Sequence, residues 1–168
     1  MRYPAKRDEE LPKKEIPESG AIEKYRPSDY YCRRGILALY LKDYPKAIAL
    51  LEDAVKLDPD SPDAHKFLAA AYLLSGREAE AISEYEKACK LDPTDYSAEL
   101  TLGMLYHIRG ELDEAIEHYR KATNIRPESA EAYLKLGLAY ASKGMPSKAV
   151  EAYREAIKIK ILEKLGEL

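Results

Sequence analysis

Cysteine and histidine are scarce in this sequence, and their spacing argues against several kinds of site. The two cysteines, Cys32 and Cys89, lie far apart and form no CxxC pair. We therefore expect two buried small hydrophobic residues, not a disulfide or a metal site. The three histidines, His65, His107 and His118, form neither an HxxxH nor an HExxH pair. The sequence predicts no metal ion and no cofactor.

Long apolar runs and an excess of positive charge are also missing. No apolar run approaches the roughly 20 residues that a helix needs to span a bilayer. The formal net charge of -3 gives no general attraction to nucleic acid or to anionic lipid. Residues 1–15 carry charges but lack the apolar core of a secretory signal. We expect a cytoplasmic protein that binds neither nucleic acid nor membrane.

Amide side chains are nearly absent, since the sequence has no glutamine and Asn124 is its single asparagine. Loss of thermolabile amides beside abundant glutamate and lysine is a tendency of proteins from hot environments. Chance in a short helical protein explains the same composition, so thermophily stays one of two interpretations.

The signatures of catalysis are missing too. The sequence contains no Gly-rich phosphate loop, no Ser-centred nucleophile elbow and no arrangement of paired carboxylates. Acidic and basic residues instead alternate in stretches such as residues 81–90, AISEYEKACK, which is typical of a solvated helix face with i,i+4 ion pairs. We predict that the protein is not an enzyme and assign no catalytic residue.

What the sequence does contain is an internal repeat of 34 residues. Four alanines at this step define the alignment: Ala47, Ala81, Ala115 and Ala149. A second set follows seven positions later: Ala54, Ala88, Ala122 and Ala156. Prolines recur at the same step in three repeats: Pro59, Pro93 and Pro127. Glycines precede the aligned alanines by five residues in the last three repeats, with Lys42 in the first: Gly76, Gly110 and Gly144.

These residue types are typical of paired antiparallel helices. Small residues recur where two helices must approach closely: Gly35, Ala69, Gly103 and Gly137. Tyrosines fill wider gaps and can turn a hydroxyl group toward water. Glycine in the turn supplies a backbone conformation that other residues resist, and a proline ends one helix and leads into the next.

The pattern resembles the tetratricopeptide-repeat (TPR) family, whose unit is a 34-residue helix–turn–helix. The resemblance implies an all-α, right-handed superhelical solenoid of four repeats, at 28–61, 62–95, 96–129 and 130–163, with the last helix extended to about 168. The first helices are expected at 28–41, 62–75, 96–109 and 130–143, and the second helices at 44–57, 78–91, 112–125 and 146–165. Repeat 1 departs most from the family pattern, as expected of an end repeat.

In TPR proteins, set positions of the first helices line a concave groove that binds partners. Carried onto this chain, those positions predict a groove with a mainly apolar floor and a few cations: Arg33, Ile36, Tyr40, Lys66, Phe67, Ala70, Leu74, Leu100, Met104, His107, Ile108, Leu134, Lys135 and Leu138. Such a patch favours a bound amphipathic helix or an extended apolar segment. Tight packing between repeats is the alternative explanation for some of the apolar positions.

One TPR subclass holds acidic chaperone tails with a two-carboxylate clamp of basic and asparagine residues. This chain offers Lys66 and Lys135 but places Ala70, Thr101 and Glu131 at the other clamp positions. The missing donors and the reversed charge argue against that ligand.

The two ends of the chain carry separate expectations. Residues 1–27 are rich in proline and mixed charge, which predicts an extended or disordered segment, either a linker or an arm that docks in the groove. At the other end, an apolar stripe runs along the last helix: Val150, Tyr153, Ile157, Ile161 and Leu165. Either the chain is a fragment of a longer protein or this stripe pairs with a second copy in a homodimer.

The sequence therefore predicts a protein–protein interaction adaptor that binds an apolar helix or segment of a partner in its groove. A self-assembling scaffold that works through its ends is one alternative. The regulatory TPR part of a larger enzyme is another.

Overall fold

The computed structural model describes residues 26–166, and within that range the chain is helical, with no strand. The helices in chain order are α1 (Pro27–Tyr40), α2 (Tyr44–Leu57), α3 (Pro62–Leu74), α4 (Glu78–Leu91), α5 (Tyr96–Ile108), α6 (Leu112–Ile125), α7 (Ala130–Ser142) and α8 (Pro146–Leu165). The prediction of an all-α fold is confirmed. Residues 1–25, most of the segment predicted to be extended, and residues 167–168 lie outside the described residues.

Capping side chains and prolines set where the helices begin. Ser61 and Ser129 each accept a hydrogen bond from the backbone N–H three residues ahead, at 3.3 and 3.2 Å. The Asp95 carboxylate does the same for α5, accepting from the N–H groups of Ser97 and Ala98. Proline occupies the first turn of α1, α2, α3 and α8, where a missing N–H loses no helical hydrogen bond.

The turn within each repeat uses a left-handed residue. Gly76, Gly110 and Gly144 have φ values of 82°, 78° and 75°, which glycine adopts without steric cost. Lys42 holds the same place in the first repeat, with φ of 59°. All four repeats therefore turn in the same way, although only three have the glycine.

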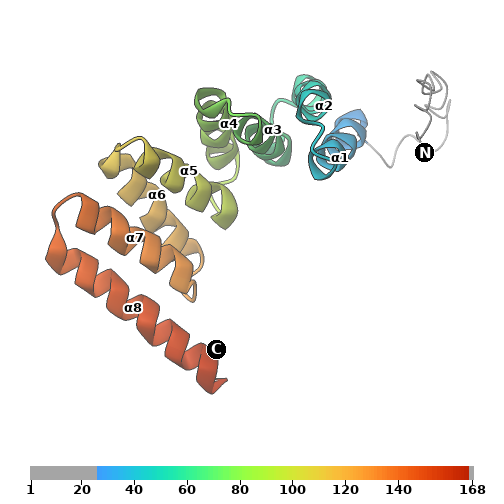
Figure 1. The fold of residues 1–168 in the computed structure, drawn as a ribbon. Helices are drawn as coiled ribbons and strands as arrows, with labels where there is room; N and C mark the ends of the chain where they lie inside the picture. Colours follow the sequence, from blue (N-terminus) through green and yellow to red (C-terminus); the bar gives the residue numbers. More distant parts are fainter. Residues whose placement is uncertain (1–25, 167–168) are drawn as a thin grey trace, which may run out of the picture.

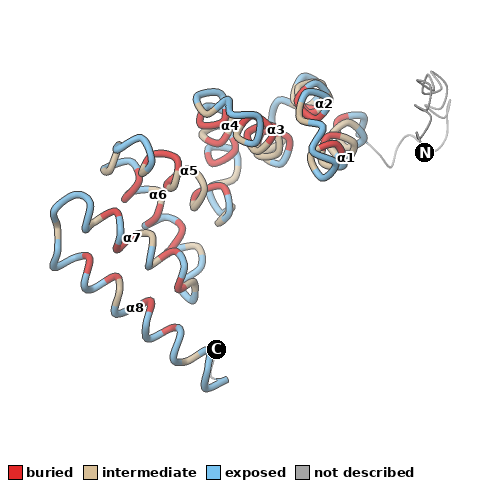
Figure 2. Tube along the Cα trace, viewed as in Figure 1, coloured by how far each residue is buried: buried red, intermediate tan, exposed pale blue. Residues whose placement is uncertain are grey.

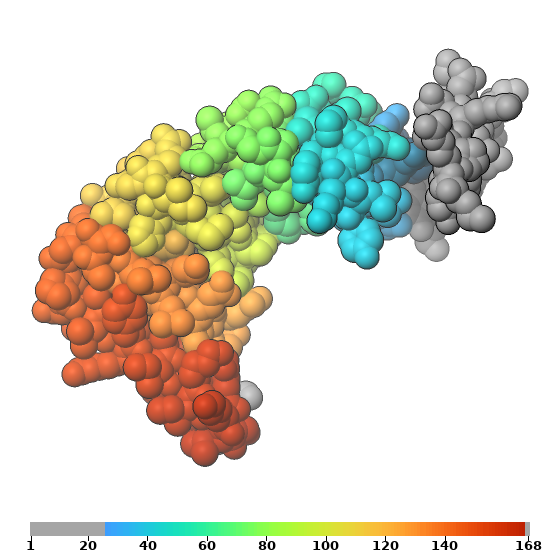
Figure 3. Space-filling model, in the orientation of Figure 1, coloured from blue at the N-terminus to red at the C-terminus, as the bar shows by residue number. Residues whose placement is uncertain are grey.

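The helices form hairpins that stack into an arc (Figure 1). Each first helix packs on the second helix of its own repeat, and α2, α4 and α6 then pack on the first helix of the next repeat. First helices also contact one another, α1 with α3 and α5 with α7, whereas no two second helices share comparable contacts in the described part. The first helices therefore lie on the inner side of the curved molecule that Figure 3 shows.

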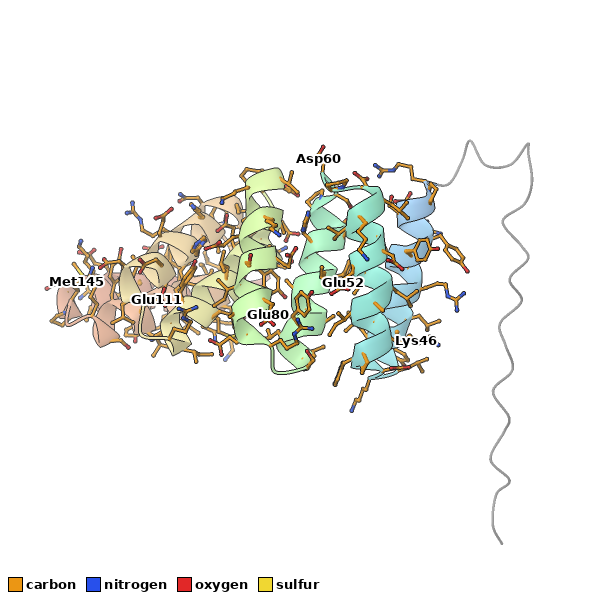
Figure 4. The ribbon with its side chains drawn as sticks, turned by 90° about the horizontal axis from the view of Figure 1, so that it is seen from above. Lys46, Glu52, Asp60, Glu80, Glu111 and Met145 are labelled. Carbon is orange, nitrogen blue, oxygen red and sulfur yellow. The ribbon has the colours of Figure 1, made fainter. Side chains whose placement is uncertain are left out.

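Turns form the two edges of the arc. Lys46, Glu80, Glu111 and Met145, at the starts of the second helices, lie along one edge in Figure 4. Asp60, in the turn between α2 and α3, lies on the opposite edge. The surfaces formed by helices are consequently the inner face, the outer face and the two ends of the stack.

The core runs along the stack where helices face each other, as the buried segments in Figure 2 show. Leu51, Leu102, Leu105 and Tyr119 are its largest fully buried apolar side chains. The helices of a repeat approach closely at the small residues: a Cβ atom placed on Gly103 would lie 2.8 Å from the Tyr119 ring. In repeats 3 and 4 the two helices thus pack a glycine of the first helix against a tyrosine ring of the second.

Candidate partner-binding groove

The fourteen residues of the predicted groove all lie on α1, α3, α5 and α7, and none of them is fully buried. Six are exposed: Arg33, Tyr40, Leu74, Ile108, Leu134 and Leu138. Eight are half-buried: Ile36, Lys66, Phe67, Ala70, Leu100, Met104, His107 and Lys135. These positions all belong to the first helices, which occupy the inner side of the arc.

Three exposed apolar side chains form a row at the C-terminal ends of α1, α3 and α5. Tyr40, Leu74 and Ile108 occupy aligned positions, and the exposed fraction of Tyr40 is 85% and that of Ile108 is 69%. The aligned residue in the fourth repeat is Ser142, whose hydroxyl lies 3.1 Å from Nε2 of His107. The row is therefore apolar over three repeats and ends in a polar contact at the fourth.

The deeper apolar positions belong partly to the core. Phe67 packs against the buried residues of the first two repeats, and Leu100 and Met104 pack against the central group around Leu102 and Tyr119. Tight packing between repeats, the alternative explanation for the apolar positions, therefore explains part of the burial of these three side chains. The row of Tyr40, Leu74 and Ile108 is the more exposed part of the apolar surface.

Lys66 is engaged within the protein. Its ammonium lies 2.6 Å from the Asp95 carboxylate and 2.9 Å from Asp63. Burial acts to lower the pKa of Lys66, but hydrogen bonds to Asp95 and Asp63 outweigh it and raise that pKa. Lys135, by contrast, forms no ion pair with any residue in the described range. Lys135 is thus better placed than Lys66 to meet an acidic group on a partner.

We expect the Lys66–Asp95 contact to stabilise the fold at neutral pH and to lose its effect in acid. Burial acts to raise the pKa of Asp95, but hydrogen bonds from Lys66, Ser97 and the backbone lower it to about 2. A depressed carboxyl pKa stabilises the fold fully above the unfolded pKa, near 4, and the contribution disappears as the pH falls through the folded pKa. The difference corresponds to about 2 kcal/mol.

Chemical unfolding of the wild type and of Asp95→Asn, at pH 7 and at pH 2, measures this contribution. Asparagine still caps a helix, so the variant mainly removes the charge. The variant should be less stable by about 2 kcal/mol at pH 7, and the gap should nearly close at pH 2. An equal gap at both pH values would contradict the assignment.

The far face of α8 is uncovered among the described residues. The exposed fraction of Val150 is 47%, against 9% for the aligned Ile116, and that of Ile157 is 58%, against 6% for the aligned Thr123. In the inner repeats the next first-helix covers these positions. Of the predicted stripe, Val150, Ile157, Ile161 and Leu165 are exposed and Tyr153 is half-buried.

At the opposite end, the sequence predicts an atypical repeat 1 but does not predict which residues on the face of α1 are exposed. Tyr30 and Leu37 are exposed there, whereas the aligned Ala64, Ala98 and Ala132 and Ala71, Leu105 and Ala139 are buried. Arg34, aligned with the core residues Leu68, Leu102 and Leu136, donates a hydrogen bond to the Tyr30 hydroxyl at 2.7 Å. The repeat alignment carries a signal of this difference, because the position of Tyr30 holds alanine in the other three repeats. This end cannot repeat the packing of the inner interfaces.

The fold and its groove define a helical-repeat module for protein interaction. Four family models match the chain: one described as TPR repeat over residues 103–144, and three described as tetratricopeptide repeat over 32–96, 84–117 and 130–160. The chain belongs to the tetratricopeptide-repeat family, and its repeats form a protein–protein interaction scaffold.

Solved structures agree with this assignment. A crystal structure of MamA is 29% identical to the chain, with a TM-score of 0.78 over 85% of this chain and 82% of that one. A second crystal structure of MamA is also 29% identical, with a TM-score of 0.77 over 85% and 78% of the two chains. MamA 41-end from Desulfovibrio magneticus RS-1 shares the fold, at 23% identity and a TM-score of 0.71 over 82% and 77%. No curated protein matches the chain.

None of the described helices is both long and apolar enough to cross a membrane. Across residues 26–166, no three His, Cys, Asp or Glu side chains come together in a group that could hold a metal ion.

Proposed function

We propose that the protein is an adaptor that binds an apolar, helical segment of a partner protein along its concave groove. The observations that carry the proposal are the exposed row of Tyr40, Leu74 and Ile108 and two further exposed leucines on α7, Leu134 and Leu138. Apolar side chains gathered on one concave face suit a ligand with apolar residues at i, i+3, i+4 and i+7. Lys135 is placed to pair with an acidic residue beside that apolar face.

The energetics require several of these anchors to act together. Burying one leucine-sized side chain is worth about 1.5–3 kcal/mol, while association and ordering cost about 4–15 kcal/mol. One or two contacts therefore give no measurable affinity. A segment that buries four or more of these apolar side chains can reach micromolar binding.

Selection of peptides from a random library on the immobilised chain tests the proposal. We expect selected peptides to carry apolar residues at helical spacing and to bind the double variant Leu74→Glu, Ile108→Glu at least tenfold more weakly. Both side chains are exposed, so the substitutions add charge to the groove without opening the core. Binding is measured by fluorescence anisotropy, and the fold by circular dichroism.

The matched control is the double variant Leu57→Glu, Leu91→Glu. These leucines occupy aligned exposed positions at the ends of the second helices α2 and α4. The control should bind the selected peptides as the wild type does. Equal binding by the groove variant, or a selection dominated by polar peptides, would overturn the proposal.

A second candidate function, self-association through the C-terminal face, rests on a different observation. Val150 and Ile157 are exposed at positions whose counterparts are buried in the inner repeats. A shallow apolar hollow adjoins them on α8, lined by Ile157, Ile161 and Leu162 with the stems of Arg154 and Lys158.

A further inference from the structure

An open pocket of about 590 Å³ lies on the outer face of the last two repeats, away from the groove. Helices α6 and α8 form its walls and α7 its floor. The residues that matter for its chemistry are Arg120 on α6, Tyr133 and Tyr140 on α7, and Lys148, Ala152 and Arg154 on α8. Comparison with the other repeats explains both its space and its charge.

The space arises because repeat 4 lacks a buried histidine–glutamate hydrogen bond that repeats 2 and 3 contain. In repeat 2, Nδ1 of His65 lies 2.6 Å from the Glu84 carboxylate. In repeat 3 the same two positions hold Glu99 and His118, again 2.6 Å apart. In repeat 4 they hold Tyr133 and Ala152. The methyl group of Ala152 leaves open the volume that a glutamate or histidine fills elsewhere.

The charge arises at the neighbouring position. The Tyr72 hydroxyl donates a hydrogen bond to Glu52 of the preceding repeat at 2.8 Å. The aligned Tyr106 hydroxyl likewise donates to Glu86.

At the third such boundary, between repeats 3 and 4, Tyr140 aligns with these two tyrosines, but the residue aligned with their glutamates is Arg120. Arginine only donates hydrogen bonds. The Tyr140 hydroxyl accordingly has no carboxylate acceptor among the residues that the structure describes.

Three cations line the pocket, and none of them forms an ion pair within residues 26–166: Arg120, Lys148 and Arg154. The Lys148 ammonium lies 5.7 Å from the centre of the Tyr140 ring. Two acidic residues, Glu151 and Glu155, share the rim, and Glu155 is paired with Lys158 at 3.5 Å. The pocket therefore has a net positive charge and an unused hydroxyl donor.

We propose that this pocket binds a carboxylate group of an acidic side chain on a partner protein. The ligand carboxylate takes the place of the missing glutamate: it accepts from the Tyr140 hydroxyl and pairs with Arg120 and Lys148. The small side chain of Ala152 admits the group. The site is on the outer face, so it goes beyond the groove proposed above and is open while the groove is occupied.

The test titrates the ¹⁵N-labelled full chain with a hexaglutamate peptide and follows backbone amide shifts. We expect shifts centred on residues 120, 140 and 148, and none with hexaglutamine. Arg120→Glu copies the residue found at positions 52 and 86, so the variant should fold and give Tyr140 an internal acceptor. It should bind hexaglutamate at least tenfold more weakly. Tyr140→Phe should bind hexaglutamate about tenfold more weakly, which is the effect of losing one hydrogen bond to a charged group.

Lys90→Glu is the matched control, since it makes the same charge reversal at an exposed residue of α4 outside the pocket. It should bind hexaglutamate within about twofold of the wild type, the change expected of a remote, screened charge. Inorganic phosphate is titrated in parallel and should bind more weakly than the peptide. The proposal is overturned if hexaglutamate does not bind, or if Arg120→Glu binds it as tightly as the wild type does. It is also overturned if Lys90→Glu weakens hexaglutamate binding as much as Arg120→Glu does, or if phosphate binds more tightly than the peptide.

Discussion

Replacing Gly103 with valine should destabilise the chain by about 3 kcal/mol or more, at the upper end of what overpacking a core costs. A Cβ atom at this position would lie 2.8 Å from Cδ1 and 2.9 Å from Cε1 of Tyr119, and 3.3 Å from the Ala115 carbonyl oxygen. Tyr119 is fully buried, and valine adds two further methyl groups beyond that Cβ atom. The two helices of repeat 3 would have to separate, which opens the central core.

Gly103→Ala is the graded control for this prediction. The aligned residue in repeat 2 is Ala69, which is fully buried in the same core group as Tyr85. One methyl group is therefore accommodated at this position by a small shift of the helices, and alanine favours the helix over glycine. Urea unfolding should place the alanine variant within about 1 kcal/mol of the wild type. A valine variant as stable as the alanine variant would contradict the close packing described here.

Ile157→Glu should weaken self-association of the chain at least tenfold. Ile157 stands at the centre of the uncovered stripe on α8, so a charge there would be buried in any dimer that uses this face. We expect the wild type to show a monomer–dimer equilibrium in analytical ultracentrifugation. The variant should remain a monomer at concentrations where the wild type is mostly dimeric.

The α1 face indicates that this association stops at the dimer. Continuation of the stack would require α1 of one molecule to pack on α8 of another, as α3 packs on α2. Tyr30 and Arg34 occupy the places where that packing uses alanine and leucine, so the two ends are not complementary. Leu91→Glu, at the exposed C-terminal end of α4, is the control and should leave the dimer unchanged. Open-ended polymers, or a wild type that stays monomeric at high micromolar concentration, would contradict this account.

The fold could be predicted because each repeated residue has a local reason for its place. Helix starts depend on capping residues such as Ser61 and on first-turn prolines, and the turns depend on glycines such as Gly76. These choices involve neighbours within a few residues. Consequently each of the eight helices begins and ends within one residue of its predicted range.

Which surface residues are available to a partner was harder to predict, because availability depends on contacts between repeats. The position of Lys66 predicts a groove cation, yet its ammonium pairs with Asp95, the residue that caps the first helix of the next repeat. The pocket beside Tyr140 requires two substitutions in different helices, Arg120 and Ala152, to act on the same space. The repeat alignment shows both substitutions, but only the structure shows that the two residues line the same pocket.

Photo-cross-linking tests most directly whether the concave groove is the binding surface. A benzoylphenylalanine is placed at position 108, the exposed last residue of the first helix α5, or at position 91, the exposed last residue of the second helix α4, and each chain is irradiated with a selected peptide. Our account predicts a cross-linked product from position 108 and none from position 91. A product from position 91 with none from position 108 would show that partners bind elsewhere.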